Sequence, residues 1–154
     1  MIQRIQTLYL AIATALSGFL LKGDIIKMVG KKGELYGLSF KGISLIGDTS
    51  MEMIEKSIPL TVLMLLVPVL FFISMLLFKN RKLQIRASVL STLLFAGVLI
   101  MILFYIFIFE KNIGAEPIYN IKLSFPLVGL VFGYLAFRAI LKDELLIKSY
   151  DRIR

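Results

Sequence analysis

The chain has 154 residues, of which 58% are hydrophobic and only 18% charged, whereas a soluble domain is about half apolar and a quarter charged. The apolar residues are concentrated in four long uncharged runs, which indicates an integral membrane protein. The chain has neither Cys nor His, so disulfides and thiolate metal sites are excluded. This composition also excludes a nucleic-acid module and a conventional soluble enzyme.

The uncharged runs predict four membrane-spanning helices, at residues 4–22, 57–78, 87–109 and 124–141. Crossing a hydrocarbon core about 30 Å thick takes roughly 20 helical residues. The two middle runs are long enough, and the outer two become long enough when flanking Lys and Arg side chains reach to the membrane surface. The first run is predicted to be a retained helix rather than a signal peptide, because it continues past the small residues of the possible cleavage site at 13–15.

The loop at residues 23–56 changes from a helical to a strand-like pattern. Residues 25–29 and 34–40 predict two strands joined by a glycine-containing turn, and residues 43–46 suggest a third. Residues 49–52 fit a capping box, so a helix is expected to begin there and to lead into the second span.

The remaining segments connect the spans or follow them. Residues 79–86 are expected to form a short cytoplasmic loop. Residues 110–123 form a second outer loop, in which residues 118–122 are an expected edge strand for the hairpin. Pro68 is expected to kink the second span, because it cannot donate a backbone hydrogen bond. Residues 142–154 predict a cytoplasmic helical tail.

The basic residues predict the orientation in the membrane. One side of the chain holds ten basic residues, including all six Arg, against three acidic ones, and the other holds eight Lys against seven acids. Because basic residues stay in the cytoplasm, both termini are predicted to be cytoplasmic. The net charge of +8 is interpreted as this topology signal together with attraction to anionic lipid headgroups, rather than as nucleic-acid binding.

Small side chains predict where the helices pack, because close helix contact in lipid requires them. Gly129 and Gly133 form a GxxxG motif that Ala136 extends. This face serves either a homodimer or the bundle itself, and packing within the bundle is favoured. Further packing positions are expected at Ala11, Gly18, Ser88 and Thr92.

The search for chemistry predicts no catalytic, cofactor-binding or metal site. None of the four runs contains the ionisable residue that transporters normally carry inside the membrane. The sequence has no HExxH motif and no phosphate-binding loop. An enzyme acting on lipid headgroups would have to use Tyr36, Asp48, Glu52 or Glu55 at the outer surface. The pair Glu52 and Glu55 is better explained as a solvated helix start than as a cation site.

Both ends of the chain resemble a known family. The opening MIQRIQTLYL and the closing DRIR resemble an uncharacterised family of small four-span inner-membrane proteins from Bacteroidota, a domain of unknown function. This resemblance implies a bacterial inner membrane and a four-helix topology, without any activity or substrate. Asp151 is predicted to pair with Arg4 or Arg152. The resemblance marks as candidate interaction residues Arg4, Gln6, Tyr9, Asp151, Arg152 and Arg154.

Together these features predict an all-α membrane protein, a four-transmembrane-helix bundle with a small extracytoplasmic β-sheet between helices 1 and 2. Its layout is similar to that of the claudins, whose outer cysteines and tryptophan it lacks. The predicted role is that of a non-enzymatic accessory or scaffold subunit in the cell envelope, with lipids and another membrane protein or a second copy as partners. The alternative is a small transporter or lipid-handling protein, which a cavity reaching the midplane would favour and a tightly packed bundle would disfavour.

Overall fold

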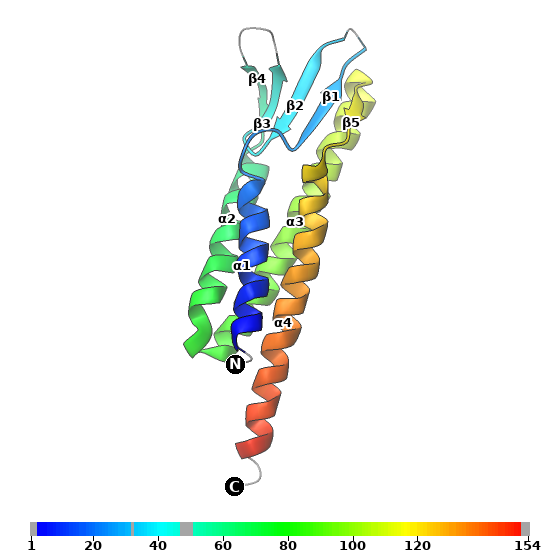
Figure 1. Cartoon of the computed structure of the whole chain (residues 1–154). Coiled ribbons are helices and arrows are strands. Elements are labelled where there is room, and N and C mark those ends of the chain that lie inside the picture. Colours follow the sequence, from blue (N-terminus) through cyan, green and yellow to red (C-terminus); the bar gives the residue numbers. More distant parts are fainter. Residues whose placement is uncertain (1–2, 32, 47–50, 152–154) are drawn as a thin grey trace.

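The protein is a four-helix bundle with an antiparallel sheet at one end (Figure 1). The structure is a computed structural model that describes residues 3–31, 33–46 and 51–151. Helix α1 packs against α2 and α4, and α3 also packs against α2 and α4, so each helix has two neighbours. The helices are α1 (Gln3–Phe19), α2 (Ile58–Leu76), α3 (Arg81–Ile113) and α4 (Ser124–Asp151).

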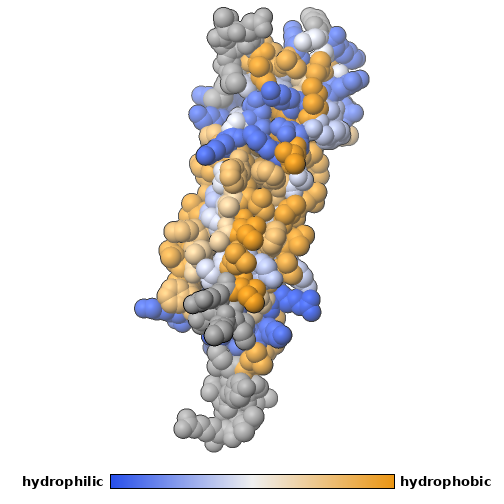
Figure 2. All heavy atoms as spheres, viewed as in Figure 1, coloured by the Kyte–Doolittle hydropathy of each residue, from blue (hydrophilic) through white to orange (hydrophobic). Residues whose placement is uncertain are grey.

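The helices carry the apolar surface of a membrane protein. Three segments are long and apolar enough to cross a membrane, namely Ile58–Lys79, Arg81–Ile113 and Ile121–Leu146, and the apolar part of α1, Ile5–Phe19, is shorter. Apolar residues cover the middle of the molecule, whereas hydrophilic residues gather towards both ends (Figure 2). A soluble protein rarely exposes an apolar patch this large, so a bilayer is the natural surrounding.

The turn between α2 and α3 is tighter than the sequence predicted. The expected loop at residues 79–86 is mostly helix, because α3 begins at Arg81 and only the short 3₁₀ turn η1 (Leu77–Lys79) and Asn80 precede it. The Ser74 hydroxyl donates to the Gln84 carbonyl across the turn at 3.3 Å. Both side chains are buried, so these polar residues belong to the helix contact and not to a solvated loop.

The sheet contains more strands than the predicted hairpin. Its strands stand in the order β4-β3-β2-β1-β5, and all neighbours are antiparallel. The expected strand at 118–122 lies earlier in the chain, at β5, and Ile121–Leu123 form a 3₁₀ turn, η2. The strands are β1 (Ile26–Val29), β2 (Leu35–Ser39), β3 (Gly42–Ile46), β4 (Met51–Lys56) and β5 (Glu116–Ile118).

The helix expected to begin at residues 49–52 is absent, and this prediction was wrong. Residues 47–50 lie outside the described part, and Met51–Lys56 form strand β4, which pairs with β3. Helix α2 begins only at Ile58, where Pro59 fits the first turn because its missing N–H leaves no intrahelical bond unmade. Pairing with β3 therefore outweighs the local capping pattern.

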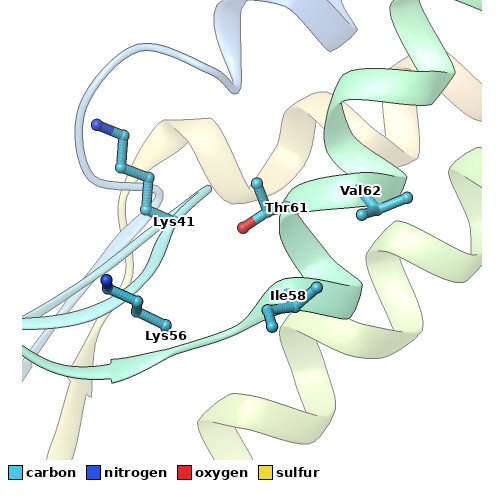
Figure 3. A pocket seen from close by; sticks show the side chains of 5 residues that line it. All are labelled: Lys41, Lys56, Ile58, Thr61 and Val62. Carbon is cyan, nitrogen blue, oxygen red and sulfur yellow. The ribbon is translucent and has the colours of Figure 1, made fainter.

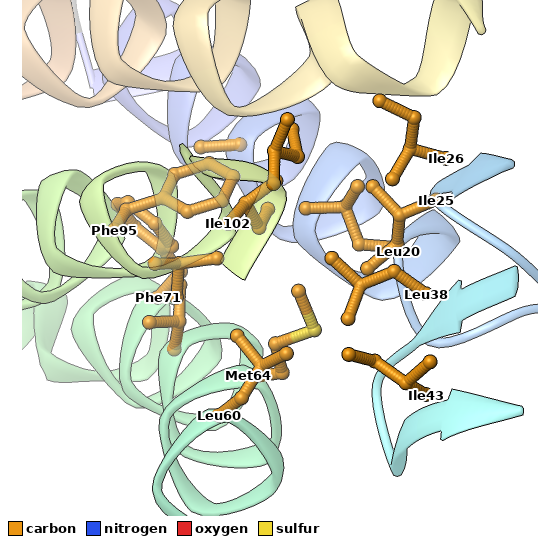
Figure 4. Packing of buried hydrophobic residues seen from close by; sticks show 14 of the residues in the cluster. Leu20, Ile25, Ile26, Leu38, Ile43, Leu60, Met64, Phe71, Phe95 and Ile102 are labelled. Carbon is orange, nitrogen blue, oxygen red and sulfur yellow. The ribbon is translucent and has the colours of Figure 1, made fainter. Parts of the chain in front are cut away.

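One hydrophobic core continues from the bundle into the sheet. In the bundle, Phe71 and Phe95 meet edge to face with their ring centroids 5.9 Å apart. At the joint, Leu20 lies together with Leu38 of β2 and Met64 of α2, directly after the end of α1 (Figure 4). The sheet is thus fixed to the helix ends by shared packing.

Candidate functional site

A buried polar contact joins α1 to α4 at the end of the bundle away from the sheet. The Gln6 side-chain amide donates to Asp143 Oδ2 and to the Ala139 carbonyl oxygen, the latter at 3.1 Å. Gln6 is 5% exposed and Asp143 is 7% exposed. The second carboxylate oxygen, Asp143 Oδ1, is buried without a hydrogen-bond partner among the described residues. This contact therefore ties the two helices together and leaves one acceptor unsatisfied.

A groove of about 340 Å³ lies beside this contact, between α1 and α4. Ile5 and Tyr9 of α1 contribute an apolar wall. On the α4 side the exposed Arg138 and Lys142 stand next to the buried Asp143. The groove therefore combines apolar surface, two cations and one carboxylate.

The structure describes only two side chains of the six predicted interaction residues. Gln6 makes the contact with Asp143, and Tyr9 lines the groove and packs on Phe132, with ring centroids 6.1 Å apart. The side chains of Arg4 and Asp151, and all of Arg152 and Arg154, lie outside the described residues. The predicted pairing of Asp151 with Arg4 or Arg152 therefore stays a prediction.

Asp143 is a residue that sequence reasoning missed. It stands between two charged neighbours, Lys142 and Glu144, and therefore resembles part of a solvated tail. The structure buries it against α1, 137 residues earlier in the chain. One available signal was the helical spacing of Ala136, Ile140 and Asp143, which places the acid on the same face as two buried apolar residues.

The GxxxG face packs on α3 within the chain. A Cβ atom at Gly129 would overlap the Phe95 ring, and one at Gly133 would lie 2.6 Å from the Thr92 hydroxyl oxygen. Ala136 is fully buried on the same helix. Glycine therefore allows α4 to approach α3 at two successive turns.

The other expected packing positions differ in their surroundings. Ser88 is fully buried, and its hydroxyl has no hydrogen-bond partner among the described residues. Ala11 is half-buried on α1. A Cβ atom at Gly18 would meet no described atom within 4 Å, so this glycine does not mark a close helix contact.

Hydrogen bonds hold the sheet to the nearby ends of the helices. The Ser57 hydroxyl donates to the Tyr105 hydroxyl at 2.6 Å, and the Thr61 hydroxyl donates to the Phe40 carbonyl at 2.8 Å. The Lys122 ammonium donates to the Lys22 carbonyl at 2.7 Å. These bonds connect α2, α3 and the segments that flank the sheet, and they add to the packing that joins the sheet to the bundle.

Tyr36 adds an aromatic contact between the sheet and α3. Its ring packs edge to face on Phe109, with centroids 6.0 Å apart. Its hydroxyl donates to the Glu34 carboxylate at 2.6 Å, and this bond raises the pKa of Tyr36 above its usual value. Tyr36 therefore stays protonated and acts as a structural donor.

A second pocket, of about 290 Å³, lies where the sheet meets the start of α2 (Figure 3). Lys41 and Lys56 line it beside Ile58, Thr61 and Val62. The Thr61 hydroxyl already bonds the Phe40 and Ser57 carbonyls. Both lysines are exposed, so this pocket resembles an ordinary membrane-surface position with cations above apolar residues.

The acidic residues that the sequence offers for chemistry on lipid headgroups do not form a cluster among the residues that the structure describes. Glu55 is exposed on β4, whereas the Glu52 side chain and Asp48 lie outside the described part. Among described residues, no group of three or more Asp and Glu side chains is placed to hold a metal ion.

The comparisons with known proteins identify a family. A protein-family model described as a domain of unknown function (DUF4293) matches residues 2–153, so the chain belongs to this family. No curated protein matches the chain. The resemblance seen at the two sequence ends, to an uncharacterised domain family, is thereby confirmed.

Proposed function

We propose that this member of the DUF4293 family is a non-enzymatic accessory subunit of a membrane complex in the bacterial cell envelope. In this proposal the helices anchor the chain in the inner membrane, both termini lie in the cytoplasm, and the sheet lies outside. The distribution of basic residues supports this orientation, since ten of them stand at residue 4, at residues 79–86 and at residues 138–154.

The observation that carries the proposal is the open edge of a sheet that is packed and hydrogen-bonded onto the ends of the helices. Strand β4 has six residues, Met51–Lys56, and in the described structure only β3 pairs with it. The opposite edge, β5, has three residues, and Pro117 in its middle lacks a backbone donor. An extended segment of another protein therefore fits the β4 edge by strand addition.

The packing of the bundle supports an anchor rather than a transport path. Phe71 and Phe95 fill the space between α2 and α3, and the ring of Phe95 also occupies the space left open by Gly129 of α4. A transported solute would need to displace these rings. We therefore favour the accessory-subunit role over the transporter alternative.

Site-specific photocrosslinking in native membranes tests this proposal. A photoreactive amino acid at Ile54, which is half exposed on β4, should form an adduct with one protein that also purifies with the tagged chain in mild detergent. Ile118 offers a matched control, because it has similar exposure on the opposite edge of the sheet. Equal adducts from both positions, or none from Ile54, would rule out the β4 edge as the docking strand.

A further inference from the structure

The groove between α1 and α4 presents three kinds of surface in a fixed order along the membrane normal. Leu135 belongs to the apolar part of α4, Arg138 follows one turn later, and Lys142 and Asp143 stand beyond it. At about 1.5 Å per helical residue, Asp143 lies about 7.5 Å further from the apolar middle than Arg138. The groove thus proceeds from apolar to cationic to acidic.

The charges in the groove are only partly compensated. Arg138 and Lys142 are exposed and bring two positive charges to the membrane surface. Asp143 is 7% exposed, and the Gln6 amide satisfies its Oδ2, whereas its Oδ1 has no hydrogen-bond partner among the residues that the structure describes. A buried carboxylate oxygen without a donor is unfavourable, so a ligand that brings a donor to this place gains binding energy.

We propose that this groove binds phosphatidylethanolamine from the leaflet at the end of the bundle away from the sheet. The acyl region lies against Ile5, Tyr9 and Leu135, the phosphate accepts hydrogen bonds from Arg138 and Lys142, and the primary ammonium donates to Asp143. The order of groups in this lipid, from acyl chain through phosphate to ammonium, is the order of surfaces along α4. The groove volume of about 340 Å³ lies at the lower end of the range for small-ligand sites, about 300–1,000 Å³.

The Asp143 carboxylate selects among phospholipid headgroups. Phosphatidylcholine presents the same phosphate, but its quaternary ammonium has no N–H to donate. Phosphatidylglycerol presents a phosphate and hydroxyl donors without a positive charge, and charge-assisted hydrogen bonds are roughly twice as strong as neutral ones. Because neighbouring atoms cover Asp143 Oδ1, binding also requires the side chains of the groove wall to adjust.

The test titrates the delipidated full-length protein in mild detergent with three lipids that have identical acyl chains. Native mass spectrometry gives the apparent affinity for phosphatidylethanolamine, phosphatidylglycerol and phosphatidylcholine. We expect phosphatidylethanolamine to bind about tenfold or more tightly than phosphatidylcholine, as the gain of a charge-assisted hydrogen bond implies. Equal affinity for these two lipids, or tighter binding of phosphatidylglycerol, would refute the proposal without any mutant.

Two variants assign the selectivity to its residues. Asp143→Asn should lower the affinity for phosphatidylethanolamine to that for phosphatidylcholine and leave phosphatidylcholine unchanged, whereas a loss shared by both lipids would refute the ammonium contact. Arg138→Gln should lower the affinity for all three lipids by a similar factor. Unchanged affinities would refute the phosphate contact. Lys82→Gln is the matched control, because Lys82 is also an exposed cation at this end of the molecule but lies outside the groove.

Discussion

At the scale of single residues, the contact between Gln6 and Asp143 shows how one polar side chain can fix the position of two helices relative to each other. Both residues are almost fully buried, and the amide reaches the carboxylate and a backbone carbonyl at once. Interhelical hydrogen bonds in lipid contribute modestly, on average about 0.6 kcal/mol, because the unfolded chain in the membrane also finds partners. The larger cost arises when one partner is removed and the other stays buried.

Replacing Gln6 by Ala should therefore destabilise the protein by about 1–3 kcal/mol, because the Asp143 carboxylate then loses its only described donor. Denaturation in mixed micelles measures the free energy of unfolding. The double variant with Asp143→Ala should be little worse than the more harmful single one, which gives a favourable coupling energy. Thr14→Ala is the control, since the Thr14 hydroxyl bonds only to Leu10 of its own helix in the described structure. Fully additive losses would contradict a direct contact.

At the scale of elements, one glycine sets the geometry in the bundle and another sets it in the sheet. Gly129 lets α4 approach the Phe95 ring, and Gly42 begins β3 with φ of +131°, directly after the turn from β2. In lipid the helices gain little from the hydrophobic effect, so close van der Waals contact has to hold them together. In the sheet, backbone pairing and packing on the helix ends have that role.

Gly129→Ala should destabilise the bundle by about 1–3 kcal/mol, because the added methyl group overlaps the Phe95 ring. Gly97→Ala provides a sharp contrast in the neighbouring helix. There the new Cβ would meet Leu63 at an ordinary distance of 3.9 Å, so replacement should stabilise α3 by up to about 1 kcal/mol. Thermal unfolding of the three proteins in one detergent compares them. Equal effects of both substitutions would mean that Gly129 is not a close contact.

Gly42→Ala should detach β4 from the sheet, because its φ disfavours L-residues and the new Cβ overlaps the Glu55 carbonyl oxygen. Hydrogen exchange of the β3 and β4 amides should then accelerate while the helices keep their protection. Gly33→Ala serves for comparison, because Gly33 also has positive φ, +80°, but no described atom lies within 4 Å of its Cβ position. If Gly33→Ala reduces the protection of β4 equally, backbone strain alone explains the lost protection, and the overlap with Glu55 does not contribute.

At the scale of the whole molecule, charge and apolar surface divide the protein into three levels. An apolar belt formed by the helices separates the sheet from the end that carries the α2–α3 turn and α4's last turns (Figures 1 and 2). Exposed residues of the belt include Ile58, Leu93 and Ile100, each at least 65% exposed. An exposed apolar surface of this kind is typical of a site that contacts a membrane or another protein.

Labelling of single cysteines tests the predicted orientation, because the natural chain has none. Lys27→Cys, exposed on β1, should react with a membrane-impermeant maleimide in spheroplasts. Lys82→Cys, exposed at the start of α3, should react only after the membrane is opened. Labelling of both positions from the same side would contradict the four-span topology. The reverse pattern would mean that the sheet lies in the cytoplasm.

The sequence allows the prediction of the helices and the first hairpin, because their patterns are local. Uncharged runs indicate spans, and glycines between two apolar segments indicate a turn. Strand β4 could not be predicted because its local sequence resembles the start of a helix, whereas its strand conformation depends on pairing with β3. The burial of Asp143 could not be predicted for the same reason, since its partner Gln6 stands at the other end of the chain.

The pairing of β5 with β1 joins strands that are made at very different times during synthesis. Strands β1 to β4 leave the ribosome before α2, whereas β5 follows only after α3. Until β5 has been made, β1 keeps an open edge of the kind to which other chains can pair. The sheet is therefore completed only after three of the four helices have been synthesised, and more than half of the chain separates its first strand from that strand's last partner.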